Sequence, residues 1–404
     1  MTYEPVTDFP SPQERRGQTH HRVRIMAVVA MMHIAMGCVG IGVPLLAISL
    51  GADSLDLGVL GTVSTAVYTA FALLFGRLSD RIGRATLVVA APFIYSAATL
   101  LAGFSKSWQT LIPLYVIAAI AMALLWPAYM ALVAEAAPRG RLVGQIAAYN
   151  VAWCSGLIIG NSVGGALAGK LGPLPLYTAS ALAAGVGGAL AVMRRSGLLR
   201  GHPAHDTAPD GELPVPAVHA RRLLGVCWCA MFASVFGISI LRMLFPKLAL
   251  DLGFAPAAIG LMFAALAAGQ AITFVALGLG RWWQYRLAPL MAAQLASVLA
   301  YVVIALTRSG AAFSLAFAVI GAAGALAYAS GYYYSVNRAL RRGTFTGMHE
   351  AILGAGGALG PLIGGLLARE VGLRTPYYAA AAAVAVAIVL QVVSRSCWRE
   401  DAVA

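Results

Sequence analysis

Four ionisable side chains lie inside long apolar segments of this sequence: His33, Arg242, His349 and Glu350. Segments of this length cross the hydrocarbon core of a bilayer, where a charged side chain costs about 2.5–3.5 kcal/mol at the centre of a helix. Imidazole titrates near neutral pH, a buried carboxylate can hold a proton, and a guanidinium pairs with anions. These residues are therefore candidates for proton transfer and for binding a charged solute.

Two of these residues fall in corresponding parts of the two halves of the sequence. His33 shares a helical face with Gly37, Gly40 and Pro44, roughly 13 Å from the start of its segment at 1.5 Å per residue. It is either a ligand or proton-titrating group in a solute cavity, or a neutral histidine bonded to a neighbouring carbonyl. Arg242 is either a ligand for an anionic substrate or a side chain that snorkels to the nearer membrane surface.

Glu350 is the best candidate for a proton-coupling carboxylate. It shares a helical face with a stripe of small residues and so points toward protein rather than lipid. Asn150, a further candidate for the substrate-binding cavity, stands 200 positions before Glu350. Tyr149 stands 200 positions before His349, so the repeat keeps polar groups at both positions and puts the ionisable ones only in the second half. The alternative is a structural ion pair between Glu350 and a basic residue of the neighbouring loop, such as Arg338.

Aromatic side chains supply further candidates for a substrate-binding cavity. Tyr328 and Tyr332 are one helical turn apart in a segment rich in tyrosine, part of which belongs to the membrane interface. Trp126 precedes Pro127 and is either a cavity wall or a packing residue.

Composition defines the class of protein. The residues are 60% hydrophobic and 11% charged, with a mean hydropathy of +0.81, whereas a soluble domain carries about 25% charged residues. The apolar runs suit helices rather than a barrel. We therefore expect an all-α membrane protein with twelve transmembrane helices, at residues 25–48, 56–76, 85–104, 109–133, 143–168, 174–193, 223–248, 256–279, 287–306, 311–336, 344–368 and 376–394.

The net charge of +13 reflects topology and not a nucleic-acid footprint. Most of the 28 Lys and Arg residues fall in the two termini and in alternate loops, which places both termini in the cytoplasm of a cell (inner) membrane protein. The first 24 residues form a polar tail rather than a signal peptide. The five cysteines lack the spacing of a metal site, so we expect neither metal nor cofactor.

One loop carries a specific motif. Residues 76–84 read Gly-Arg-Leu-Ser-Asp-Arg-Ile-Gly-Arg between two apolar runs. This loop resembles the one between helices two and three of the major facilitator superfamily, and the matching residues are Gly76, Asp80, Arg81, Gly83 and Arg84. The resemblance implies that Asp80 latches the cytoplasmic side by pairing with cations and a helix N-terminus; the alternative is a solvated loop acid. The second half has no acid at the matching position.

The sequence repeats itself with an offset of about 200 residues. Four glycines recur, and we expect them to bring helix backbones into close contact: Gly156, Gly160, Gly164 and Gly165 correspond to Gly356, Gly360, Gly364 and Gly365. Gly58 similarly corresponds to Gly260. We expect a tail at 1–24, six-helix bundles at 25–193 and 223–394, a polar linker at 194–222 and a tail at 395–404. This pseudo-symmetry also resembles the major facilitator fold, in which substrate lies between the halves.

The resemblance implies a secondary transporter that works by alternating access, and we expect a small-molecule substrate, a lipid environment and a monomer. Proton coupling and export remain open, and export rests only on a fifth-helix glycine motif that the family associates with exporters. The sequence has no Walker-type phosphate loop, nor the paired nucleophile and base of an intramembrane enzyme. The remaining alternative is a transporter-like receptor that moves no solute.

Overall fold

The computed structural model describes residues 12–135, 142–170, 172–199, 217–336 and 342–400. Within these ranges, the side chains of 12–22, 76–82, 131, 133–135, 142–147, 217–222, 336, 342–346 and 395–400 are not described. The described residues form helices and no strand. In chain order these are α1 (Pro12–Ser49), α2 (Ser54–Ile82), α3 (Arg84–Gly103), α4 (Trp108–Glu135), α5 (Leu142–Ala168), α6 (Leu174–Arg195), α7 (Ala217–Asp251), α8 (Pro256–Gly278), α9 (Leu287–Leu306), α10 (Gly310–Val336), α11 (Arg342–Glu370) and α12 (Thr375–Glu400).

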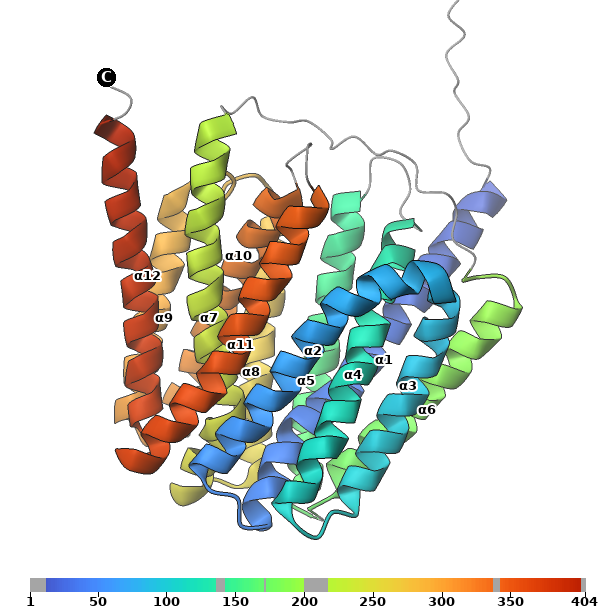
Figure 1. The fold of residues 1–404 in the computed structure, drawn as a ribbon, viewed down its shortest axis with the longest axis horizontal. Helices are drawn as coiled ribbons and strands as arrows, with labels where there is room; N and C mark the ends of the chain where they lie inside the picture. Colours follow the sequence, from blue (N-terminus) through green and yellow to red (C-terminus); the bar gives the residue numbers. More distant parts are fainter. Residues whose placement is uncertain (1–11, 136–141, 171, 200–216, 337–341, 401–404) are drawn as a thin grey trace, which may run out of the picture.

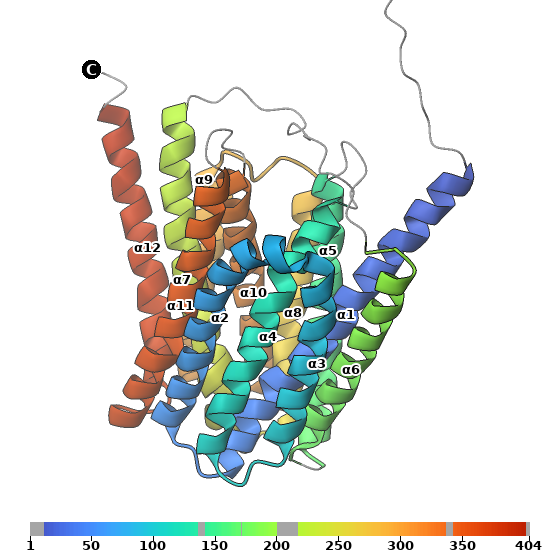
Figure 2. The same ribbon diagram turned by 45° about the vertical axis from the view of Figure 1, so that its right-hand side comes forward.

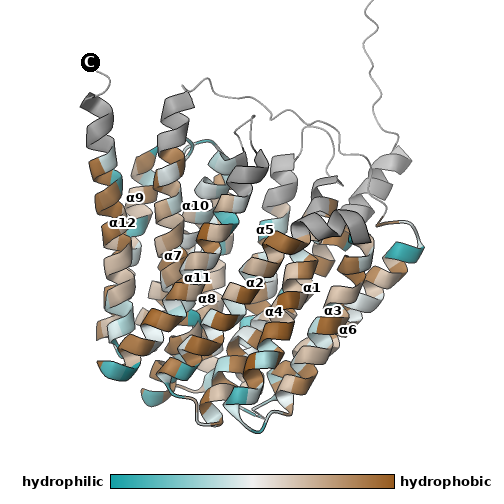
Figure 3. Cartoon of the chain, in the orientation of Figure 1, coloured by the Kyte–Doolittle hydropathy of each residue, from teal (hydrophilic) through white to brown (hydrophobic). Residues whose placement is uncertain are grey.

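All twelve helices of the described part of the chain are long and apolar enough to cross a membrane. A helix suits this setting because it satisfies its backbone hydrogen bonds internally. Figure 3 shows apolar residues along the length of the helices and hydrophilic residues concentrated toward their described ends. The predicted all-α membrane fold with twelve spans is confirmed.

Several helices extend beyond the apolar segments that predicted them. Helix α1 begins at Pro12, inside the expected tail, and α7 begins at Ala217, inside the expected linker. Helix α12 continues to Glu400. Hydropathy marks where a helix leaves the hydrocarbon, but polar residues can continue the same backbone hydrogen bonding in water. The spans predicted at 25–48, 223–248 and 376–394 agree with the membrane-crossing parts of these helices, Val23–Ser49, Leu223–Asp251 and Thr375–Ser394.

The helices form two groups. Helices α1–α6 form the N-half and α7–α12 form the C-half, and the largest contacts between the halves are those of α5 with α8 and of α2 with α11. Figure 1 shows the start of α1 and the end of α12 at the same end of the molecule, which we call the terminal end. The opposite end, which we call the far end, carries the short turns that follow α1, α3, α5, α7, α9 and α11.

The repeat in the sequence appears as a repeated turn at the far end. Gly51 ends α1 with a φ of 89°, and Gly253 follows α7 with a φ of 83°. In both turns the next amide donates a 2.9 Å hydrogen bond back into the helix, from Ala52 to Ala47 and from Phe254 to Ala249. A left-handed glycine is the usual residue for such a helix ending. The pseudo-symmetry therefore extends to backbone conformation.

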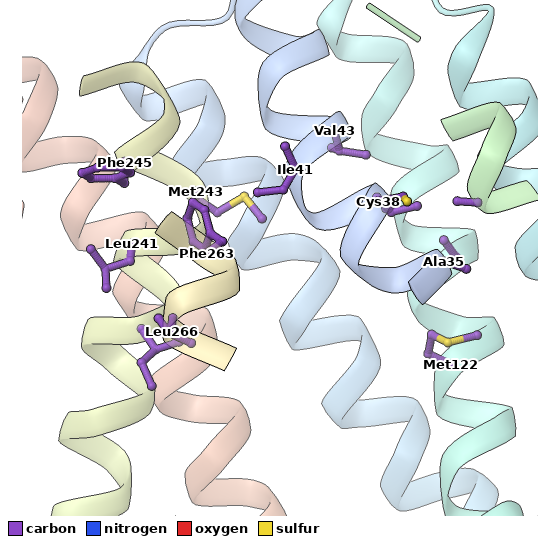
Figure 4. Packing of buried hydrophobic residues seen from close by; sticks show 14 of the residues in the cluster. Ala35, Cys38, Ile41, Val43, Met122, Leu241, Met243, Phe245, Phe263 and Leu266 are labelled. Atoms are coloured by element: carbon purple, nitrogen blue, oxygen red, sulfur yellow. The ribbon is translucent and has the colours of Figure 1, made fainter. Parts of the chain in front are cut away.

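A continuous apolar core joins the two halves. It includes Ala35, Cys38 and Ile41 of α1 together with Leu241 and Met243 of α7. Figure 4 shows Met243 extending from α7 toward α1, where Ile41 lies. Met243 also contacts the N-half at α2, because a Cβ on Gly61 would lie 2.6 Å from its Cγ. Residues of both the N-half and the C-half therefore contribute to one apolar core.

The halves approach each other through their backbones at two glycine pairs near the far end. A Cβ on Gly165 of α5 would lie 2.8 Å from the Cα of Gly260 of α8. A Cβ on Gly58 of α2 would lie 3.2 Å from the Cα of Gly365 of α11. Gly58 corresponds to Gly260 in the repeat, and Gly165 corresponds to Gly365. The two pairs are therefore equivalent contacts related by the pseudo-symmetry. We call these contacts the glycine crossings.

Polar contacts between the halves also gather near the far end. The Thr62 hydroxyl donates to the Ala358 carbonyl at 2.7 Å, and the Asn161 amide donates to the Phe263 carbonyl at 3.3 Å. At the outermost turn, Lys247 donates to the Ala52 carbonyl at 3.4 Å, and Arg369 pairs with Asp53 at 3.8 Å. The exposed Arg369–Asp53 pair contributes little by itself. Backbone contacts and hydrogen bonds therefore hold the halves together near the far end.

The contact between α2 and α11 continues to the middle of the helices, where Thr69 meets Gly354. Beyond that level the halves diverge. Figures 1 and 2 both show α1 and α6 leaning away from α7 and α12 toward the terminal end. The halves are therefore in contact at the far end and spread at the terminal end.

Candidate functional site

His33 lies in the middle of α1 and is buried. Its Nδ1 is 2.8 Å from the Val29 carbonyl, which can only accept, so Nδ1 carries a hydrogen. The ring stacks on Trp126 of α4 with centroids 4.5 Å apart, and Trp153 of α5 lies 5.8 Å away. His33 is thus held by its own helix on one edge and by two indoles on its faces. This geometry leaves Nε2 as the nitrogen available to a ligand.

Arg242 lies deeper than the sequence predicted, because α7 continues to Asp251 instead of ending near residue 248. It is therefore nine residues from the end of the helix, or roughly 13 Å at 1.5 Å per residue. The side chain is exposed, yet it interacts electrostatically with His33 and with Tyr115 of α4. Both partners belong to the N-half, so the guanidinium is directed across the interface and not outward toward lipid.

No acidic residue within the described part of the chain pairs with Arg242. Its electrostatic partners are an imidazole bonded to a carbonyl and a phenol, neither of which supplies a full negative charge at neutral pH. A guanidinium inside a span without an internal counter-charge is well suited to bind an anion.

Glu350 lies on α11 and is half-buried. It interacts electrostatically with four tyrosines from three other helices. These are Tyr68 of α2, Tyr149 of α5, and Tyr328 and Tyr332 of α10. Among the described side chains no cation pairs with Glu350; Arg338, the partner named in the structural alternative, lies outside the described residues. The carboxylate therefore interacts with hydroxyl-bearing rings contributed by both halves.

His349 precedes Glu350 but faces a different set of atoms. It is completely buried, and its ring centroid lies 5.4 Å from that of Tyr328 and 5.7 Å from that of Tyr332. A Cβ on Gly331 would lie 3.4 Å from its Nδ1. Neither ring nitrogen has a hydrogen-bond partner within the described residues. His349 therefore packs behind the two tyrosines and supports their position next to Glu350.

The candidates fall into two clusters that are joined by aromatic rings. We call the first the Arg242 cluster (Arg242, His33, Tyr115, Trp126) and the second the Glu350 cluster (Glu350, His349, Tyr68, Tyr149, Tyr328, Tyr332). Trp126 meets Tyr149 edge to face at 6.3 Å, which links the two clusters within the N-half. Asn150, another sequence candidate, is buried on α5 beside Tyr149.

Trp153 is a site residue that the sequence reasoning missed. It is half-buried on α5 and contacts three helices, with ring centroids 5.8 Å from His33, 6.0 Å from Phe274 and 6.0 Å from Tyr328. Phe274 belongs to α8 and Tyr328 to α10, so Trp153 connects the halves in mid-membrane. A sequence signal existed: Tyr149 and Trp153 are four residues apart, as are Tyr328 and Tyr332.

The motif at residues 76–84 has a different backbone conformation from the one that the sequence predicted. The sequence predicted a loop there, but α2 continues to Ile82 and α3 begins at Arg84. Gly83 alone makes the turn, with a φ of 92° that favours glycine. Gly76, Asp80 and Arg81 therefore belong to the last turns of α2, and their side chains lie outside the described residues. Arg84 is half-buried at the start of α3.

The repeated glycines lie at helix contacts, and equivalent positions have equivalent partners. Gly160 of α5 meets Ile34 of α1, since an added Cβ would lie 2.9 Å from the Cα of Ile34. Gly360 of α11 meets Phe236 of α7 in the same way. Gly156 and Gly164 also face α1, while Gly356 and Gly364 face α7. Gly165 and Gly365 differ from these, because they face the opposite half at the glycine crossings.

Several solved transporter structures have a fold similar to that of this chain. A bacterial homologue of the human lysosomal transporter Spinster, in an inward-facing and unoccupied conformation, covers 96% of each chain with a TM-score of 0.69 and 15% identity. The nucleoside transporter NupG covers 93% of this chain and 98% of its own, with a TM-score of 0.72 and 14% identity. The human organic anion transporter MFSD10 has a TM-score of 0.63, 18% identity and coverage of 94% and 100%. At these identities the likeness shows the fold.

Sequence comparison adds a relative and a family. A protein of Cupriavidus pinatubonensis named "Probable 4-methylmuconolactone transporter" is 30% identical over 120 residues. That segment spans 29% of this chain and 28% of the relative's length. The model of the Major Facilitator Superfamily matches residues 25–226 and again 227–401, so each half of the chain matches it separately.

The two family matches in tandem, the twelve membrane-crossing helices of the described residues and the similar transporters named above agree with one another. This chain is a multi-pass solute-transport protein, not an enzyme, and it belongs to the Major Facilitator Superfamily.

Proposed function

We propose that this protein is a secondary active transporter that moves a small organic anion across the cell membrane by alternating access. The observation that carries the proposal is Arg242, an exposed residue whose guanidinium belongs to a membrane-crossing helix. It lies about 13 Å inside α7, faces the N-half and has no acidic partner among the described residues. A bound carboxylate would supply the missing counter-charge in a setting where paired charges interact more strongly than in water.

We further propose that the terminal end faces the cytoplasm. The support is the concentration of Lys and Arg in the termini and in the loops of that end. With this orientation the glycine crossings lie on the outer side, and the arrangement corresponds to an inward-facing state. Because one chain supplies both clusters from its two halves, we propose that a monomer is sufficient for transport.

Proton coupling is proposed through Glu350. This carboxylate is half-buried within the membrane-crossing part of α11, and its neighbours Tyr68, Tyr149, Tyr328 and Tyr332 come from both halves. A rearrangement of the halves would therefore change its surroundings, and with them its affinity for a proton. The phenol groups can donate hydrogen bonds to the ionised form.

The name of the curated relative fits a small organic solute, since it refers to a lactone. The fifth-helix glycines do not favour a direction, because Gly156, Gly160 and Gly164 pack on α1 while their second-half counterparts pack on α7 in the same way. Vesicles loaded on one side, with a pH gradient imposed in either sense, measure the direction directly.

The test is solute counterflow in proteoliposomes with a panel of small carboxylates and matched neutral amides. Arg242→Gln should lower the affinity for carboxylates by about ten- to a hundredfold, the range expected for a hydrogen-bonded charge, and affect the amides little. Arg242→Lys serves as the matched control that keeps the charge and should retain part of the affinity. Equal losses for carboxylates and amides would refute the role in anion binding. Binding without any flux would instead favour a transporter-like receptor.

A further inference from the structure

We propose that the substrate of this site is a planar carboxylate with an unsaturated ring, whose ring lies against Trp153 and Tyr328 while its carboxylate meets Arg242. This inference rests on the proposed function, because it names the class of anion that the same site selects. It starts from the rings of the two clusters and from the position of Trp153 between them.

The aromatic rings form a continuous network through the middle of the bundle. Trp126 stacks on His33, Trp153 lies 5.8 Å from His33, and Tyr328 lies 6.0 Å from Trp153. Tyr332 then stacks parallel to Tyr328, with centroids 6.4 Å apart and planes 7° apart. These rings come from α1, α4, α5 and α10, so both halves contribute.

Part of this network is accessible. Trp153, Tyr328 and Tyr332 are each half-buried although they face the interface between the halves, while Trp126 and Phe274 are buried behind them. The accessible rings are held by buried neighbours, so their faces are fixed in position. Rigid aromatic faces attract flat π-systems in offset or edge-to-face arrangements.

The cation is linked to these rings through His33. Arg242 interacts electrostatically with His33, and His33 is in ring contact with both Trp126 and Trp153. A small flat acid can therefore contact the guanidinium with its carboxylate and the indole with its ring. Tyr328, which is in ring contact with Trp153, also interacts electrostatically with Glu350, so a second acidic group on the substrate would be disfavoured near Tyr328.

The experiment uses the full chain in proteoliposomes and compares benzoate with cyclohexanecarboxylate, which has the same charge and a similar size but no π-system. Competition for counterflow gives an affinity for each probe. The wild type should prefer benzoate by about two- to tenfold, the range expected for one ring contact beyond simple burial. Trp153→Leu should lower the affinity for benzoate more than that for cyclohexanecarboxylate, so that the ratio falls toward one.

Two further variants separate recognition from folding. Trp153→Phe keeps a ring and should preserve the preference for benzoate. Trp282→Leu removes a tryptophan that is exposed and lies after α8, outside both clusters, and should leave the ratio unchanged. Equal affinities in the wild type, or an unchanged ratio in Trp153→Leu, would overturn the inference while leaving anion transport intact. If neither carboxylate competes, the proposed anion transport itself fails, and this inference fails with it.

Discussion

A single methyl group at a glycine crossing should shift the balance between conformations. In Gly165→Ala the new Cβ would lie 2.8 Å from the Cα of Gly260 and 2.6 Å from the carbonyl oxygen of Pro256. Carbon atoms in contact prefer about 3.5–4.0 Å, so α5 and α8 must separate by roughly 1 Å. Overpacking of this kind costs about 1–3 kcal/mol, which disfavours the far-end contact by about 5- to 150-fold.

The neighbouring glycine supplies a matched control. In Gly164→Ala the new Cβ would lie 2.9 Å from the Cα of Cys38, a contact of similar severity. Cys38 belongs to the same half as Gly164, so this clash persists whichever way the halves are arranged. Gly164→Ala should therefore lower thermal stability without changing the conformational balance.

Distances between spin labels at the far end measure the effect. Labels on Lys170 and Asp251, both exposed, report the separation of the two halves in a background without native cysteines. Gly165→Ala should add or enlarge a population with a longer distance, whereas Gly164→Ala should keep the wild-type distribution. If both variants broaden the distribution equally, or if Gly165→Ala leaves it unchanged, the glycine crossings do not control the closure of this end.

Two further outcomes follow from the structure, and a third follows from the sequence motif at residues 76–84. Glu350→Gln should abolish pH-driven accumulation in vesicles while solute counterflow persists; accumulation that survives would exclude this carboxylate as the proton carrier. Asn161→Ala removes the bond to the Phe263 carbonyl and should favour the long-distance population of the far-end labels by about two- to twelvefold, and no shift would show that the bond is dispensable for closure. Asp80→Asn should alter the accessibility of introduced cysteines at both ends with little loss of folded protein, and unchanged accessibility would contradict the latch.

The sequence predicted the fold well because hydropathy and the 200-residue repeat report on forces that act along the whole chain. Twelve apolar runs gave twelve spans, and Gly165 and Gly365 already indicated close helix contacts. What the repeat could not show was that Gly165 meets Gly260 rather than a residue of its own half. Which helix a glycine faces depends on how the halves dock, and an offset between copies does not contain that information.

The site was predicted less completely, for a related reason. Arg242 and Glu350 were conspicuous because charge is costly in a membrane. Trp153 was not, because an indole in an apolar helix is ordinary, and only its contacts with His33, Phe274 and Tyr328 distinguish it. The helical ending of the motif at Ile82 was missed because the charges of that segment suit a loop and a helix end equally well.

The glycine crossings also have a consequence for how quickly the far end can open and close. Gly165 and Gly260 meet through backbone atoms alone, as do Gly58 and Gly365. Ordering a long side chain at an interface costs up to about 2 kcal/mol of conformational entropy, whereas glycine has no side chain to order. Closing these two contacts therefore costs no side-chain conformational entropy at the glycines, and opening them regains none. A joint built from bare backbone can form and separate many times with little entropic loss in either direction.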